Sequence, residues 1–406
     1  MHTSHRTFVV KKTIANSFLI IGNTIGSGIL ALPLVTAVFG FLPSVLILTF
    51  AWLVMTYSAK LLLECSYWVK EEQNLVSILS MTLSKPWKII VSLLYLAMLY
   101  AMLVAYISIS ADLTQSVLKQ AFTLELPYYS IVLMFTLVFG IVVFYSMAVL
   151  ERYTRYLVVV LLLIFLFMVS SALPHVSLIN LQVQHYSGLI WTLPLAILCF
   201  GYPMIVPSLR QYCGDEKMRA VHVIMLGSFL ALLMYILWLF AVLGAMPLAG
   251  DHGIHALPDQ KISSLTAALQ AITHNHYLSA GLITFAYFAV ATSFMSIAKI
   301  VFDFLNDAFL QLNWKNPRAS AQVLSLLPPV LISVYIPGLF VYALMFSGAI
   351  IGILLVFLPA VLVWRGRYHN NFSHYYQCEG GKRVLIAMMG VGLMVALVEI
   401  FHKLFY

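Results

Sequence analysis

The chain has 406 residues, of which 62% are hydrophobic and only 9% are charged. Soluble domains carry roughly 25% charged residues, so this composition excludes an ordinary water-soluble protein and indicates a chain that lies in a lipid bilayer. The formal net charge is +8, but the basic residues lie in short segments between apolar runs, which argues against a nucleic acid partner. The four cysteines lie in or beside apolar runs without metal-ligand spacing, so we expect no disulfide framework, metal site or cofactor.

Apolar runs long enough to cross a bilayer recur along the whole chain. A spanning helix needs about 20 mostly apolar residues. The first run begins at Phe8 and is too long for a signal peptide, so it is interpreted as an uncleaved span. The eleven predicted spans are 14–38, 41–64, 88–117, 127–149, 155–173, 188–211, 218–245, 277–306, 320–337, 339–364 and 383–404.

The distribution of Lys and Arg predicts the orientation of these spans. Of the 22 such residues, Lys60 and Lys299 fall within spans, and Lys119, Lys261 and Lys403 fall on the face opposite to the N-terminus. All the others fall on the N-terminal face. Basic residues are enriched on the cytoplasmic side, so we expect a cytoplasmic N-terminus and a C-terminus on the other face. The longest connection, 246–276, is predicted to carry a short helix over 263–273.

Two of the spans are interrupted by helix-breaking residues. The first contains Gly22-Asn23-Thr24-Ile25-Gly26-Ser27-Gly28, and the sixth contains Phe200-Gly201-Tyr202-Pro203. Glycine and proline weaken a helix, and main chain freed inside a membrane needs new hydrogen-bond partners. The interruptions lie five spans apart, which places them in halves of opposite orientation. This pattern indicates an inverted-repeat transporter with a site at the midplane; close helix packing at small residues is the alternative.

Short motifs in the same order along nearly the whole chain strengthen this interpretation. They are the stretches 22–33, 105–108, 173–175, 200–202, 206–209, 291–294 and 302–305. At these residues the chain resembles the hydroxy/aromatic amino acid permease family, in its tyrosine/tryptophan-specific branch. That family belongs to the amino acid–polyamine–organocation superfamily with the LeuT-type fold.

The resemblance implies an all-α integral membrane protein with one transmembrane transporter domain over 1–406. Its expected architecture is a LeuT-type five-plus-five inverted repeat, about 13–175 and 186–365, with helices 1 and 6 broken and an extra eleventh helix at 383–404. The implied location is the bacterial inner membrane, with a cytoplasmic N-terminus, a periplasmic C-terminus and a monomer as the working unit.

The resemblance also implies import of an aromatic amino acid, tyrosine or tryptophan, by symport with a cation, usually a proton. A serine/threonine or broader neutral amino acid symporter, coupled to sodium, is the alternative. A membrane-embedded enzyme is disfavoured because the twelve histidines are scattered. A channel is disfavoured because it would not need paired breaks in inverted halves.

A zwitterionic substrate needs hosts for two charged groups. The half-helix that starts after the first break offers free N–H groups and a positive dipole end for the carboxylate, at Gly26, Ser27 and Gly28. Ser27 could equally bond back to its own helix. The ammonium group needs acceptors, which unwound carbonyls near both breaks could supply, at Gly22, Asn23, Phe200 and Gly201.

The aromatic side chain of the substrate needs an apolar pocket. Phe200, Tyr202 and Tyr106 are the candidates, although most aromatic residues in such a chain serve packing. After Phe200-Gly201-Tyr202 the branch commonly has histidine and small residues, whereas this chain has Pro203, Met204 and Ile205. The resulting apolar pocket disfavours tyrosine, whose hydroxyl needs a partner, relative to tryptophan or phenylalanine.

Adjacent hydroxyl residues on the eighth span form a candidate ion site. In LeuT-type sodium symporters, hydroxyls corresponding to Thr292 and Ser293 hold a sodium ion together with carbonyls, which here would be those of Gly22, Ile25 and Ala289. Oxygen ligands suit a hard cation. Paired hydroxyls also join membrane helices without any ion.

Lys299 is an ionisable residue within the eighth span, and such residues are functional candidates. Some proton-coupled relatives carry a lysine on the fifth span, where this chain has Leu161. Lys299 is therefore a candidate for the group that titrates during transport. The alternatives are that it extends to the membrane surface or pairs with Asp303 one turn further on.

Overall fold

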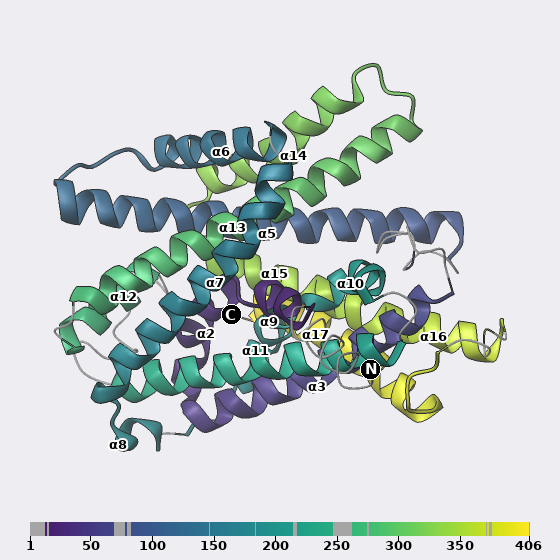
Figure 1. Ribbon diagram of the computed structural model, residues 1–406, viewed down its shortest axis with the longest axis horizontal. Coiled ribbons are helices and arrows are strands. Elements are labelled where there is room, and N and C mark those ends of the chain that lie inside the picture. The colour runs from purple at the N-terminus through teal and green to yellow at the C-terminus, as the bar shows by residue number, and fades with distance from the viewer. Residues whose placement is uncertain are drawn as a thin grey trace, which may run out of the picture.

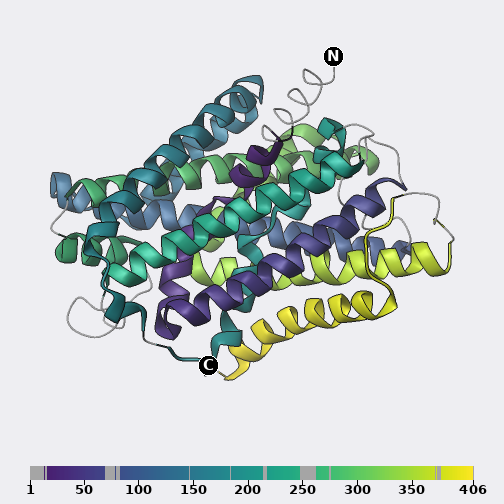
Figure 2. The same ribbon diagram turned by 60° about the horizontal axis from the view of Figure 1, so that its bottom comes forward.

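The computed structural model consists of helices joined by short connections, with no strand among the residues it describes. The described residues are 13, 16–68, 78, 83–145, 147–182, 184–213, 217–246, 262–273, 276–370, 372 and 376–405. Most of the long helices run roughly along the longest axis of the molecule (Figures 1 and 2). Each helix satisfies the hydrogen bonds of its own main-chain groups, as a bilayer requires.

The first half of the chain begins with a bent helical pair. Asn16–Thr24 is helical and meets Gly28–Phe39 at an angle of 48°. The second member consists of α2 (Ser27–Thr36) and the 3-10 turn η1 (Ala37–Phe39). The following elements are α3 (Phe41–Ser66), α5 (Lys85–Phe122), α6 (Tyr128–Tyr145), α7 (Met147–Ala172), η2 (Leu173–His175) and α8 (Leu178–Leu181).

The second half begins with another interrupted segment, formed by η3 (Leu189–Thr192), α9 (Leu193–Cys199), η4 (Tyr202–Ile205) and α10 (Val206–Cys213). The short helix predicted over 263–273 is confirmed as α12 (Ile262–Thr273). The other elements are α11 (Lys217–Ala245), α13 (His276–Gln311), α14 (Pro317–Tyr335), α15 (Phe340–Ile351), the π-helical turn η6 (Gly352–Phe357), α16 (Leu358–Tyr368) and α17 (Lys382–Phe405).

Among the described residues, six helices are long and apolar enough to cross a membrane, or seven if the bent pair is one span. The six agree within a few residues with the predicted spans 41–64, 88–117, 218–245, 277–306, 339–364 and 383–404. The bent pair coincides with the predicted span 14–38. Helices also lie over 127–149, 155–173, 188–211 and 320–337, but they are shorter, interrupted or less apolar. The number eleven therefore stays a prediction.

Close contacts around α9 place the interrupted segments inside the bundle. Every residue of α9 is buried, and the helix packs against α2, α3 and α15. A Cβ atom at Gly348 in α15 would overlap the carbonyl group of Pro194 in α9, so only glycine allows this approach. Helix α11 packs along α3 and runs beside it in both views (Figures 1 and 2).

A buried ion pair joins α3 to α16. Arg367 donates two hydrogen bonds to the Glu64 carboxylate, with N···O distances of 2.7 and 2.5 Å, and their side chains are 8% and 0% exposed. Arg367 also donates to the carbonyls of Cys378 and Gly380, and the Cys378 amide donates to Glu64. These bonds fix the connection between α16 and α17 on the end of α3.

We expect Glu64→Ala to lower the melting temperature of the purified protein in detergent. The substitution leaves the Arg367 guanidinium buried without its counter-ion, and breaking a buried pair costs about 3–5 kcal/mol. The exposed pair of Lys119 and Glu125, at 2.8 Å, provides the control, because exposed pairs contribute little. Equal melting temperatures for Glu64→Ala and Glu125→Ala would contradict this prediction, and Glu64→Leu/Arg367→Leu should recover part of the loss.

Candidate substrate site

The first interruption lies at Ile25 and Gly26, between two helical segments. The Gly26 amide donates to the carbonyl of Thr24 at 2.9 Å, whereas a continuous helix would direct it to the carbonyl of Gly22. The Gly22 carbonyl has therefore lost its helical donor. Gly26 is the N-cap of α2 and provides no side chain to cap it, so the first amide groups of α2 point toward the break.

The second interruption lies at Phe200 and Gly201. Their amides donate to the carbonyls of Ile197 and Leu198, at 3.1 and 2.9 Å, in a tightened 3-10 turn that ends α9. The chain continues as η4, with Pro203 near its start. Because proline has no amide hydrogen, it cannot donate to the carbonyl of Cys199 four residues earlier. The break therefore follows from the local sequence.

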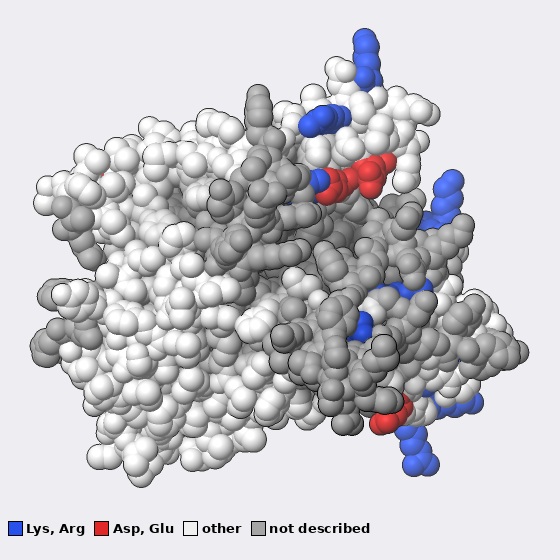
Figure 3. Space-filling view, viewed as in Figure 1, with Lys and Arg blue, Asp and Glu red and all other residues white. Residues whose placement is uncertain are grey.

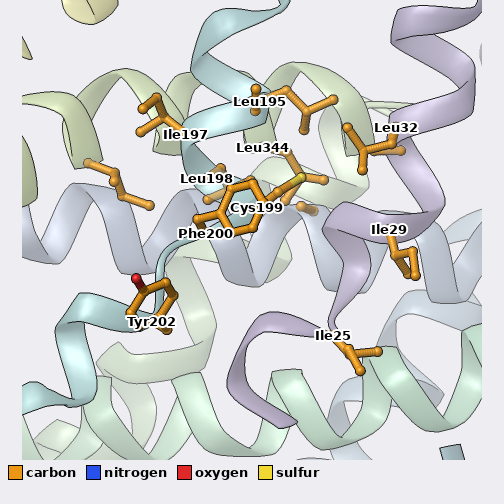
Figure 4. Close-up of a cluster of buried hydrophobic side chains, with 14 of the residues drawn as sticks. Ile25, Ile29, Leu32, Leu195, Ile197, Leu198, Cys199, Phe200, Tyr202 and Leu344 are labelled. Atoms are coloured by element: carbon orange, nitrogen blue, oxygen red, sulfur yellow. The ribbon is translucent and has the colours of Figure 1, made fainter. Parts of the chain in front are cut away.

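The two interruptions lie beside each other. A Cβ atom on Gly28, at the start of α2, would lie 2.9 Å from the Sγ atom of Cys199 at the end of α9. Figure 4 shows the ribbon losing its helical form between Ile25 and Ile29 and again between Phe200 and Tyr202. Segments far apart in the sequence thus bring four helix ends together.

A cavity of about 730 Å³ opens where these ends meet. Helices α5, α7 and α13 form its other walls. Its described lining contains no Asp, Glu, Lys or Arg. The lining residues are Asn16, Phe18, Leu19, Gly22, Asn23, Thr24, Gly26, Gly28, Met102, Tyr106, Val159, Leu161, Leu198, Cys199, Gly201, Met204, Ile205, Leu209, Thr292, Ser293, Ser296, Ile297 and Ile351.

The cavity collects many of the residues predicted to contact the substrate or the ion. The predicted residues that line it are Gly22, Asn23, Gly26, Gly28, Tyr106, Gly201, Thr292 and Ser293. The side chain of Ser27 lies outside the described part of the structure. Ile25 and Ala289 are buried beside the lining, at 4% and 0% exposure.

The structure does not place Phe200 and Tyr202 in the cavity. Both side chains are fully buried, and the Tyr202 hydroxyl donates to Oγ1 of Thr56 in α3 at 2.9 Å. The Phe200 ring packs edge-on against Tyr235, with centroids 5.3 Å apart. The 3-10 geometry of this segment rotates these side chains into the protein, and in their place Met204 and Ile205 line the cavity.

The candidate ion residues on α13 lie against the first break. A Cβ atom on Gly26 would lie 3.2 Å from the Ser293 hydroxyl oxygen. The Thr292 hydroxyl donates within its own helix, to the carbonyls of Phe288 and Ala289 at 2.8 and 3.0 Å. Leu161 of α7 lines the same cavity. Of the candidate ion residues on α13, Ser293 therefore lies against the first break, whereas the Thr292 hydroxyl is bonded within its own helix.

Lys299 forms an ion pair with Asp303 one turn further along α13. Its ammonium group also lies 5.2 Å from the centroid of the Phe302 ring. Neither Lys299 nor Asp303 lines the cavity. Pairing with Asp303 is one of the alternatives to a titrating role that the sequence indicates for Lys299.

Several lining residues were not predicted, although a helical pattern relates them to residues that were. Met102 precedes Tyr106 by four residues and Ser296 follows Thr292 by four, so each pair shares a helix face. Tyr235 of α11 was also missed. Its hydroxyl lies 2.6 Å from the carbonyl oxygen of Thr24 and 2.9 Å from that of Cys199, and no local pattern in span 7 marks it.

Residues 10–399 match the tryptophan/tyrosine permease family. The chain belongs to this family. The permease is 28% identical to "Tyrosine-specific transport system 2" of Haemophilus influenzae, across 95% of this chain and 96% of that protein. It is 29% identical to "Tryptophan-specific transport protein" of Shigella flexneri, across 96% of this chain and 95% of that protein. The family consists of transporters, so this permease is not an enzyme.

Two solved transporter structures share the fold of this permease. The Eremococcus coleocola manganese transporter aligns with a TM-score of 0.61 at 14% identity, covering 99% of this chain and 87% of that one. Mhp1, a nucleobase-cation-symport-1 family transporter, aligns with a TM-score of 0.62 at 12% identity, covering 96% and 91%. The permease is therefore an all-helical, multi-span membrane protein structurally similar to LeuT-fold transporters.

We expect Gly28→Ala to reduce transport strongly, because the added methyl group pushes α2 away from α9. The atom it meets is Sγ of Cys199, and the next nearest atoms of that residue lie at 3.5 and 3.7 Å, in ordinary contact. Adding Cys199→Ala removes Sγ and should restore much of the activity. Uptake of labelled amino acid is the measurement, with Cys199→Ala alone as the control; no recovery in the double variant would contradict close contact between the two breaks.

Proposed function

We propose that this permease imports an aromatic amino acid by proton symport, with alternating access to a midplane site between its two interrupted helices. The observation that carries the proposal is the cavity where both breaks meet, whose described lining carries no charged side chain. A neutral zwitterion fits such a cavity, because helix ends supply partial charges for both of its ionic groups. Curated relatives named for tyrosine and for tryptophan are equally similar, so similarity alone does not choose between them.

The substrate is oriented by the helix ends. The carboxylate binds at the start of α2, near Gly26 and Gly28, where amide groups lack helical partners. The ammonium group binds on the opposite side, where the Gly22 carbonyl has lost its donor to Thr24. This assignment uses opposite dipole ends of the two half-helices for opposite charges.

The aromatic side chain lies among Met102, Tyr106, Met204 and Ile205, which all line the cavity. Methionine adapts its shape and makes favourable contacts with aromatic rings. Met204 and Ile205 offer no partner for a phenol hydroxyl, so we propose that tryptophan is preferred over tyrosine.

The cavity opens toward the basic end of the molecule. Residues before the first break and after the second, such as Asn16, Phe18 and Leu209, line it, whereas Ile29, Leu30 and Leu32 beyond the first break are at most 1% exposed. The Lys and Arg side chains visible in Figure 3 lie in the right-hand half, where α5 begins and α16 ends in Figure 1. With basic residues inside, this is a cytoplasm-facing state of an eleven-span inner-membrane protein.

Proton coupling is supported by what the family resemblance implies. The sodium-coupled alternative is supported by one observation, the proximity of the Ser293 hydroxyl to Gly26 and the first break. Oxygen atoms from both elements could surround a sodium ion. The two forms of coupling differ in the ion whose inward gradient drives uptake.

We expect membrane vesicles to accumulate labelled tryptophan against its gradient when a proton gradient is imposed, and to lose the accumulation when a protonophore is added. Removal of sodium should have no effect. Unlabelled tyrosine and phenylalanine should compete, and serine should not. A sodium requirement would contradict proton coupling, competition by serine would favour a general neutral carrier, and equilibration without accumulation would exclude symport.

We expect Lys299→Met to retain proton-driven uptake at close to the wild-type rate. The ion pair with Asp303 gives Lys299 a partner away from the cavity, and i,i+4 pairs on helices contribute roughly 0.3–0.5 kcal/mol. The measurement is initial uptake as a function of the imposed pH difference, with Lys315→Met as the control. Loss of the pH-gradient dependence in Lys299→Met alone would identify Lys299 as the group that titrates.

A further inference from the structure

Tyr235 of α11 contacts both helix breaks through one hydroxyl group. Its side chain is fully buried, and the hydroxyl lies 2.6 Å from the carbonyl oxygen of Thr24 and 2.9 Å from that of Cys199. Thr24 is the last helical residue before the first break, and Cys199 is the last residue of α9 before the second. Both residues line the cavity.

The chemistry of the Cys199 carbonyl explains why it needs a donor from outside its own helix, whereas the Thr24 carbonyl also accepts from the Gly26 amide. In a continuous helix the Cys199 carbonyl would accept from residue 203, which is proline and has no amide hydrogen. Helix C-termini carry partial negative charge, so two such ends brought together repel each other. A tyrosine hydroxyl has a single proton to donate, and here that proton lies within reach of both ends.

We propose that Tyr235 is a positioning residue that ties the carbonyl ends of the two interrupted helices together and so sets the spacing of the substrate site between them. The Tyr235 ring packs edge-on against Phe200 within the second break, with an interplanar angle of 86°. The tether thus comes from α11, which packs along α3, and reaches both interrupted segments at once. The link to substrate affinity rests on the proposed function, whereas the tether itself is a property of the structure.

Tyr235→Phe removes the hydroxyl and keeps the ring. We expect the KM for tryptophan uptake to rise about tenfold with little change in maximal rate, because loss of one buried hydrogen bond typically has an effect of about this size. Tyr100→Phe is the matched control, since the Tyr100 hydroxyl also donates to a main-chain carbonyl, that of Leu324 at 2.6 Å, but away from the breaks. It should keep the wild-type KM.

A second readout does not depend on transport. Ser296 is exposed and lines the cavity, so Ser296→Cys should react with a membrane-impermeant thiol reagent from the cytoplasmic side. The native cysteines give low background because all four are buried, and burial raises the pKa of the Cys378 thiol to about 11, which keeps it protonated. Adding Tyr235→Phe should slow the reaction at least threefold as the cytoplasm-facing arrangement loses its tether, whereas adding Tyr100→Phe should not.

The outcomes separate this inference from the proposed function. If the wild type transports no aromatic amino acid, the proposed function fails, and the thiol reaction still decides whether the tether exists. Equal KM values and equal reaction rates for Tyr235→Phe and Tyr100→Phe would overturn the inference. So would a lower melting temperature in Tyr235→Phe with both readouts unchanged, since that result assigns Tyr235 to packing alone. If Tyr235→Phe does not fold, Tyr235→His and Tyr100→His are compared by the same two readouts.

Discussion

Main-chain groups freed inside a bilayer must find new hydrogen-bond partners, and this constraint organises the centre of the molecule. A helix satisfies its own amides and carbonyls, so each interruption creates donors and acceptors that lipid cannot satisfy. At the two interruptions here, a single side chain provides a donor for both. They lie beside each other, inside the helix bundle, and the Tyr235 hydroxyl reaches one carbonyl at the end of each interrupted helix. The main-chain amides and carbonyls that remain without a partner lie at the cavity, where a substrate or water can form hydrogen bonds with them.

The parts of the fold that depend on local sequence could be predicted, and those that depend on tertiary contacts could not. Hydropathy predicted the long spans, because an uninterrupted run of about 20 mostly apolar residues is typical of a membrane-spanning helix. Glycine and proline indicate where the main chain can leave the α-helical path, because their effect on the backbone is local. The buried pair of Glu64 and Arg367 was not predicted as a pair, because residues 303 positions apart become neighbours only through packing.

The candidate site shows the same division at the level of single side chains. Main-chain positions such as Gly22, Gly26 and Gly201 line the cavity, because their role follows from where the helix stops. The aromatic residues of the second break do not, because a 3-10 turn rotates side chains differently from an α-helix. Proximity to a break therefore predicted which glycine positions line the cavity, but it did not predict the direction of the Phe200 and Tyr202 side chains.

Absence of charged side chains from the described lining also bears on selectivity. Each half-helix end supplies roughly half an elementary charge, enough to complement the two ionic groups of a zwitterion. A substrate with a third charge on its side chain would have to leave that charge among Met102, Met204 and Ile205, where no described lining side chain carries a compensating charge. Burying an unpaired charge in apolar surroundings is far more costly than burying an aromatic ring, whose transfer from water is favourable. On the proposed function, we therefore expect this cavity to favour a substrate with a large neutral side chain over one with a charged side chain, although no described lining residue carries a charge that would repel the latter.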